Sequence, residues 1–219
     1  DKLIVPPESY GLNGLVKGNK SLTYIELPKS LRKLLVDEFV GCDNLKEIVF
    51  TNEKYDFDSH DGVFESPLSE CKNLEILRLP KKQEQIRFDM FSKCTKLKEL
   101  ELPVDLDYIS LAGSQYEDSL GFLSVEEDCS AFNIKKRDKE MIATLEMQMM
   151  LARRKMNALS IQTIISNSAK SLSERNVKVF NLVPAIKEIY LIDKEPHVEI
   201  NGFKIVESDR VGYHKYVKN

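Results

Sequence analysis

The sequence predicts an α/β solenoid of short parallel strands, with an α-helical insert and a β-hairpin-like C-terminal cap. Three observations support this prediction. A fixed spacing of apolar residues, called the grid below, recurs along the chain at a basic step of 23 residues. The strand-like end of three copies is followed by proline, which cannot continue a strand because it lacks an N–H. A unit this short cannot bury its apolar face alone, so neighbouring units must stack and share one core.

The grid reads F-x-x-C-x-x-L-x-x-I-x-L. Three copies match it closely, FVGCDNLKEIVF, LSECKNLEILRL and FSKCTKLKELEL. Two others, VKGNKSLTYIEL and FNLVPAIKEIYL, have Asn19 and Val183 in the cysteine slot. The five copies begin at residues 16, 39, 68, 91 and 180, so the steps are 23, 29, 23 and 89 residues. The long last step marks the interval where the repeat is interrupted.

The cysteines of the grid are Cys42, Cys71 and Cys94. A slot that also accepts Asn and Val is not used for thiol chemistry, and the spacings match no zinc-binding pattern. We therefore expect buried free thiols that act as small apolar side chains. Cys129 lies off the grid and is left unassigned. The predicted structural repeat positions are Leu22, Leu45, Cys42, Cys71, Leu74, Cys94, Leu97 and Ile186.

Each unit is expected to contain one strand and one return leg. The I-x-L alternation, as in IEL at 25–27, predicts a short strand with one buried face. After Pro28 and Pro80, eleven positions lead to the next Phe, with apolar residues placed among charges. The 29-residue step adds six residues within the polar run 51–62, which is expected to form a surface loop.

This loop contains the one candidate metal site of the chain, DFDSHDG, in which Asp56, Asp58 and Asp61 resemble a calcium-binding loop. An EF-hand loop needs oxygen ligands at positions 1, 3 and 5 and Gly at position 6. Here His60 holds position 5 and Asp61 position 6, so the register is wrong. A solvated loop is the preferred interpretation, and no cofactor is expected.

The pattern F-x-x-C-x-x-L-x-x-I-x-L-P at a 23-residue step resembles the BspA-type leucine-rich repeat. The resemblance covers about residues 3–111 and again 180–191. It implies a leucine-rich-repeat solenoid of a family that is largely surface-exposed or secreted in bacteria and some protozoa. Adhesion or protein binding is the function it usually implies, and it places the chain outside the cell or on a bacterial cell surface.

The interval 136–173 contains neither Gly nor Pro, and its apolar residues at 142, 145, 149, 152, 156 and 159 follow a helical stripe. Five of the six Met lie between Met141 and Met156, and flexible thioethers suit both cores and binding grooves. The predicted helix either packs on the solenoid, which we favour, or binds a partner or a second copy. Residues 157–160 are a candidate break between two helices.

Alternating apolar residues around Asn201–Gly202 predict the C-terminal hairpin, with its turn at this dipeptide. The predicted organisation is a repeat solenoid over 1–111, an acidic segment with the helical insert over 112–176, and a returning repeat with the cap over 177–219. All three parts are expected to form one structural unit.

Composition and motifs favour a non-enzymatic binding module. The net charge is −3, and neither a nucleophile elbow, a zinc-protease motif nor a phosphate-binding loop occurs. The basic cluster 153–155 lacks the interleaved aromatics of a nucleic-acid site, and no segment approaches the roughly 20 apolar residues of a membrane span. The expected ligand is a protein, with a glycan as one alternative. The other alternative is a scaffold that self-associates through 136–173.

Overall fold

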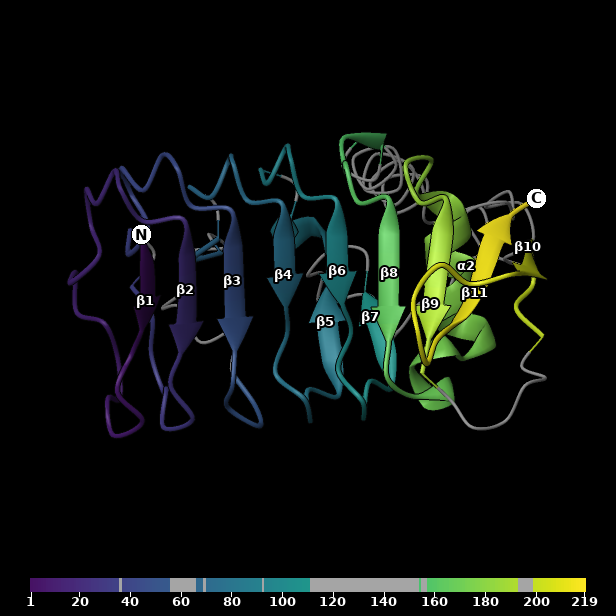
Figure 1. Ribbon diagram of the computed structural model, residues 1–219, viewed down its shortest axis with the longest axis horizontal. Helices are drawn as coiled ribbons and strands as arrows, with labels where there is room; N and C mark the ends of the chain where they lie inside the picture. The colour runs from purple at the N-terminus through teal and green to yellow at the C-terminus, as the bar shows by residue number, and fades with distance from the viewer. Residues whose placement is uncertain are drawn as a thin grey trace, which may run out of the picture.

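A computed structural model describes residues 1–35, 37–55, 66–68, 70–91, 93–110, 154, 157–192 and 199–219. Among these residues, nine strands form one sheet in the order β1-β2-β3-β4-β6-β8-β9-β11-β10, and β5 and β7 form a second sheet. The strands of the long sheet are β1 (Lys2–Ile4), β2 (Tyr24–Leu27), β3 (Glu47–Phe50), β4 (Ile76–Arg78), β6 (Glu99–Glu101), β8 (Thr163–Ser166), β9 (Glu188–Leu191), β10 (Phe203–Val206) and β11 (His214–Lys218). They lie side by side along the length of the molecule (Figure 1).

The first seven strands of this order run parallel, from β1 to β9. Their register places equivalent repeat residues opposite one another, so a continuous apolar row lines the inside of the sheet. The members of this row from β2 to β9 are Ile25, Ile48, Leu77, Leu100, Ile164 and Ile189, each 0% exposed. Stacking therefore supplies the apolar burial that a single unit lacks, and the predicted leucine-rich-repeat solenoid is confirmed.

The return legs form the opposite wall. They contain β5 (Gln85–Arg87) and β7 (Tyr108–Ser110), which pair in parallel, the 3-10 helices η1 (Phe88–Phe91) and η3 (Ala169–Leu172), and the α-helix α2 (Glu174–Leu182). Ser173 caps α2, since its hydroxyl accepts a hydrogen bond from the Asn176 N–H. The side chain of Asn176 is completely buried and accepts a 2.9 Å hydrogen bond from the Ile109 N–H. This contact attaches α2 to the edge strand β7.

The predicted helical segment 136–173 is wrong at its C-terminal end. Residues 163–166 form β8, which pairs with β6 on one side and β9 on the other. The run Ile161-Gln-Thr-Ile-Ile is rich in β-branched residues, which favour strands, and its Ile164 lies on the inner row of the sheet. Arg154 and Asn157 are helical; the rest of the stripe before residue 157 lies outside the described residues.

The predicted C-terminal hairpin is confirmed, but its turn is not at Asn201–Gly202. That dipeptide forms a turn before β10, in which the Phe203 N–H donates to the Ile200 carbonyl and Gly202 has a φ of +83°. The hairpin is closed instead by residues 207–213, between β10 and β11. Because β11 pairs antiparallel with β9, the hairpin ends the parallel stack.

The structure joins 163–166 and 188–191 to the same sheet as the first repeats. The proposed division at residues 111 and 176 nevertheless stays a prediction, because residues 111–153 lie outside the described part of the chain.

Candidate interaction surface

The repeat positions singled out from the sequence all point into the solenoid. The apolar ones are at most 1% exposed, and the three cysteines at most 6%. They are Leu22, Leu45, Leu74, Leu97 and Ile186, together with Cys42, Cys71 and Cys94. These residues stack the units and are not available to a ligand on the surface.

The three repeat cysteines are free thiols. Cys42 Sγ donates to the Val16 carbonyl at 3.0 Å, and Cys94 Sγ to the Leu68 carbonyl at 3.4 Å, in both cases on a neighbouring unit. Burial raises the pKa of Cys71 well above its ordinary value and that of Cys94 to about 12. At neutral pH these side chains therefore remain protonated and chemically inert.

The calcium candidate Asp56, Asp58 and Asp61 lies in 56–65, outside the described residues. Within the described ranges, no group of three or more His, Cys, Asp or Glu side chains is placed to hold a metal ion. No described helix is long and apolar enough to cross a membrane.

The outer side of the long sheet is the extended surface that this fold presents to solvent. Along β2 and β3, buried residues alternate with partly exposed ones, which point away from the core. We call the outward side chains of β1, β2, β3, β4 and β6 the open face. Its members are Lys2, Ile4, Tyr24, Glu26, Glu47, Val49, Ile76, Arg78, Glu99 and Glu101.

Arg78 on β4 connects three strands of this surface. Its guanidinium is 3.1 Å from Glu47 on β3 and 2.6 Å from Glu101 on β6, and it reaches Glu99 at 4.0 Å. Partial burial acts to lower the pKa of Arg78, but Glu101 and Glu47 raise it above its ordinary value. The charge network fixes the side chains of this region and leaves it with more carboxylates than cations.

A second part of the outer side is covered by the connection between β10 and β11. We call residues 207–213 the strap; it crosses in front of β9 (Figure 1). Ile165 and Tyr190 point outward from β8 and β9, yet they are only 2% and 1% exposed. They do not belong to the inner core cluster. The strap covers Tyr190, since Asp209, Arg210 and Tyr213 all contact this side chain.

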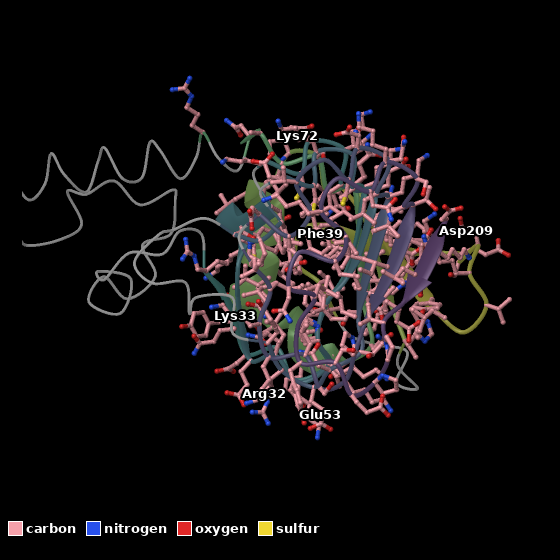
Figure 2. The ribbon with its side chains drawn as sticks, turned by 90° about the vertical axis from the view of Figure 1, so that its left-hand side faces the viewer. Arg32, Lys33, Phe39, Glu53, Lys72 and Asp209 are labelled. Atoms are coloured by element: carbon pink, nitrogen blue, oxygen red, sulfur yellow. The ribbon has the colours of Figure 1, made fainter. Side chains whose placement is uncertain are left out.

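The strap is attached by polar and aromatic contacts. Arg210 pairs with Glu99 at 2.7 Å and lies 4.3 Å from the ring centroid of Tyr190. The Tyr190 hydroxyl donates to Asp209 at 2.6 Å, and Lys215 contacts the same carboxylate at 3.1 Å. The Tyr190 and Lys215 contacts lower the pKa of Asp209 to about 2. Seen along the solenoid, Asp209 lies outside the sheet, on the side away from the core residue Phe39 (Figure 2).

Neither part of this surface has a direct signal in the sequence. The grid marks inward positions, whereas the outward positions of L-x-x-I-x-L carry Tyr, Glu, Val, Ile or Arg without a pattern. Those outward positions could have been read as a surface once the strands were assigned. The strand β8 could have been found from Ile161-x-x-Ile164, since it repeats 25 residues later at Ile186-x-x-Ile189.

Comparison with models of protein families shows to which family the chain belongs. The model of the BspA type leucine-rich repeat region matches residues 16–133 with six copies, which is more than half of the chain. The chain belongs to the BspA-type leucine-rich repeat family. No curated protein matches it significantly. As a BspA-type repeat protein it has a solenoid of the kind that typically serves as a binding scaffold, and leucine-rich repeats generally mediate protein interactions.

Proposed function

We propose that this BspA-type repeat protein is a non-enzymatic binding module that holds a protein partner on its open face. The proposal rests on a difference between two parts of the outer side of the sheet, one covered by the strap and one exposed. On the side where the strap lies, the outward residues Ile165 and Tyr190 are buried, whereas Ile4 at the other end is 67% exposed. The open face is thus a surface of fixed side chains that remains accessible to a partner.

The chemistry of the open face suits a protein ligand. Ile4, Val49 and Ile76 supply apolar area, and Tyr24 and Arg78 are of the residue types that are enriched at the energetic centres of protein interfaces. Ion pairs such as Glu47–Arg78 join neighbouring strands, so little side-chain entropy is lost when a partner binds. A rigid face of this kind supports binding without a catalytic pocket.

Site-specific photo-cross-linking tests the proposal. The photoreactive residue p-benzoylphenylalanine would replace Val49 or Ile76 on the open face, and Lys33 as a matched control. Lys33 lies on the side away from Asp209 (Figure 2). Cells or surface extracts would be irradiated, and cross-linked proteins identified by mass spectrometry. We expect one protein to be captured from Val49 and Ile76 and not from Lys33.

The captured protein would then be purified and its affinity measured. Val49→Asp should weaken binding about tenfold or more, because it places a charge in the buried part of the interface. Lys33→Asp should leave the affinity unchanged. Equal affinity for the Val49→Asp and unchanged chains would refute the open face as the binding surface.

Location and self-association are separate proposals. We propose an extracellular or bacterial cell-surface location, supported by the typical location of BspA-type proteins. Self-association through 136–173 remains the alternative function, and glycan binding a more remote one. Light scattering of the intact chain and of a chain lacking 136–156 would test self-association without disturbing β8.

A further inference from the structure

We infer that Tyr24 and Glu26 on the open face form a binding point for an arginine side chain of the protein partner. The inference rests on the proposed function and specifies it further, because it names the chemistry that the partner must present. It follows from the surroundings of Glu26 and from the way in which the same sheet already holds Arg210.

Glu26 differs from the other carboxylates of the open face. Glu47, Glu99 and Glu101 each form an ion pair with Arg78 or Arg210. In the described part of the chain, Glu26 forms none. Its Oε2 accepts a 3.2 Å hydrogen bond from the Tyr24 hydroxyl. The other carboxylate oxygen can accept from a further donor, and no described cation forms an ion pair with this carboxylate.

Apolar side chains flank Glu26 on both sides. The strand register places Ile4 of β1 opposite it on one side and Val49 of β3 on the other. Ile4 is 67% exposed and Val49 is partly exposed. A carboxylate between apolar neighbours loses water when a partner covers it, and this strengthens a charge-assisted hydrogen bond. The site therefore favours a cation that carries apolar surface of its own.

Arginine meets this requirement better than lysine. The guanidinium is weakly hydrated, stacks on aromatic rings and offers several donors to a carboxylate. Lys2 lies 5.3 Å from the Tyr24 ring centroid, so the ring already attracts a cation within the chain. Lys2 is itself exposed, and its ammonium lies against the ring and forms no ion pair with Glu26 in the described part of the chain. An incoming arginine would combine both contacts, ring and carboxylate.

The strap shows this combination at the other end of the sheet. There Arg210 lies over the ring of Tyr190 and pairs with Glu99. Tyr190 and Tyr24 are both outward residues of parallel strands, and the carboxylate of the Arg210 site comes from Glu99 on β6. Tyr24 and Glu26 likewise place an aromatic ring and a carboxylate on the outer side of the sheet, without the arginine.

A blocked tripeptide tests the inference on the intact chain. Acetyl-Val-Arg-Val-amide would be titrated while the side-chain NMR signals of Tyr24, Ile4 and Val49 are followed. Peptides with lysine or citrulline in place of arginine serve as ligand controls. Glu26→Gln is the test variant. Glu53→Gln is the matched control, because Glu53 is an exposed carboxylate at an edge of the solenoid, where it pairs with Lys82 (Figure 2).

We expect saturable shifts of all three residues with the arginine peptide, and an affinity about tenfold lower for the citrulline peptide and for Glu26→Gln. The lysine peptide should bind more weakly than the arginine peptide, and Glu53→Gln should bind as the unchanged chain does. The inference is overturned if the signals do not move up to about 10 mM peptide, or if Glu26→Gln binds the arginine peptide with the affinity of the unchanged chain.

The cross-linked partner separates this inference from the proposed function. A partner whose affinity falls in Val49→Asp but not in Glu26→Gln would overturn the arginine inference and leave the open face as the binding surface. A partner that is insensitive to both substitutions would overturn the proposed function as well.

Discussion

The hydroxyl of Tyr190 on β9 donates a 2.6 Å hydrogen bond to the carboxylate of Asp209 on the strap. This bond joins a residue of the last repeat to a loop that has no repeat pattern. Together with Arg210 above the same ring, it holds the strap against Tyr190 on the outer side of the sheet. The attachment covers part of the outer side of the sheet and leaves the open face accessible, and it gives the first prediction.

Replacing Tyr190 by Phe removes the hydroxyl donor while it keeps the aromatic ring. The pKa of Asp209 is about 2 in the native chain, lowered first by the Tyr190 hydrogen bond and then by Lys215. We expect the pKa to rise toward the ordinary value of 3.8 in Tyr190→Phe. Titration of the carboxyl carbon by NMR measures it.

The sign of the associated stability effect follows from the lowered pKa. A lowered native pKa stabilises the fold above the unfolded-state pKa, and this contribution is lost as the pH falls toward 2. Acid unfolding of Tyr190→Phe should therefore depend less on pH between about 4 and 2 than that of the native chain. An unchanged titration of Asp209 would contradict the hydrogen bond.

Ile164 tests whether β8 belongs to the repeat core. Ile164→Ala should lower the free energy of unfolding by about 2–5 kcal/mol, because the side chain is completely buried between β6 and β9. Ile205→Ala is the matched control at a position that is 54% exposed, and it should cost about 0.5 kcal/mol or less. Urea unfolding followed by circular dichroism compares them. Equal costs would mean that residues 163–166 are not part of the core.

Asn176 tests the attachment of α2 to the second sheet. Asn176→Ala should cost about 1–3 kcal/mol, because it leaves the buried Ile109 N–H without its acceptor. Asn44 donates to the Lys20 carbonyl at an exposed position, and Asn44→Ala should cost about 1 kcal/mol or less. The same urea experiment measures both. A cost for Asn176→Ala no greater than that of the control would contradict the attachment.

The repeat thiols should be unreactive until the chain unfolds. In a Cys129→Ser background, the reaction of Cys42, Cys71 and Cys94 with Ellman's reagent at pH 8 should be at least about 100-fold slower in the native than in the unfolded chain. The physical reason is burial, which excludes the reagent and raises the thiol pKa values. Rapid reaction of three thiols in the native chain would contradict the stacked arrangement.

Much of the fold was predictable because the repeat is a local pattern. The spacing of Phe, Cys and Leu in copies such as 39–50 and 91–102 predicts inward positions, and inward positions are what a shared core requires. The strand β8 was missed because Lys155 stands where the other copies have an aromatic or aliphatic residue, and Ala158 where they have Cys, Asn or Val. Because the first residue and the cysteine slot of the grid are both lost here, the absence of Gly and Pro from 136–173 favoured the prediction of a helix.

The candidate surface was harder to predict from the sequence than the core. Outward residues such as Tyr24 and Val49 do not pack in the shared core. Their identities therefore vary from unit to unit without a periodic signal. The hairpin turn was misplaced because Asn201–Gly202 is a strong local turn signal. It does form a turn, but this turn precedes β10, which pairs with β11, and β11 pairs in turn with β9.

The sequence by itself determined that this chain is a BspA-type solenoid, since a repeated apolar grid has one efficient way to be buried, by stacking. Only the tertiary structure decided which part of the outer surface stays open. That depends on contacts such as Arg210 with Glu99, which are 111 residues apart in the chain. No local pattern encodes a pair that is brought together by the stacking of the units between them.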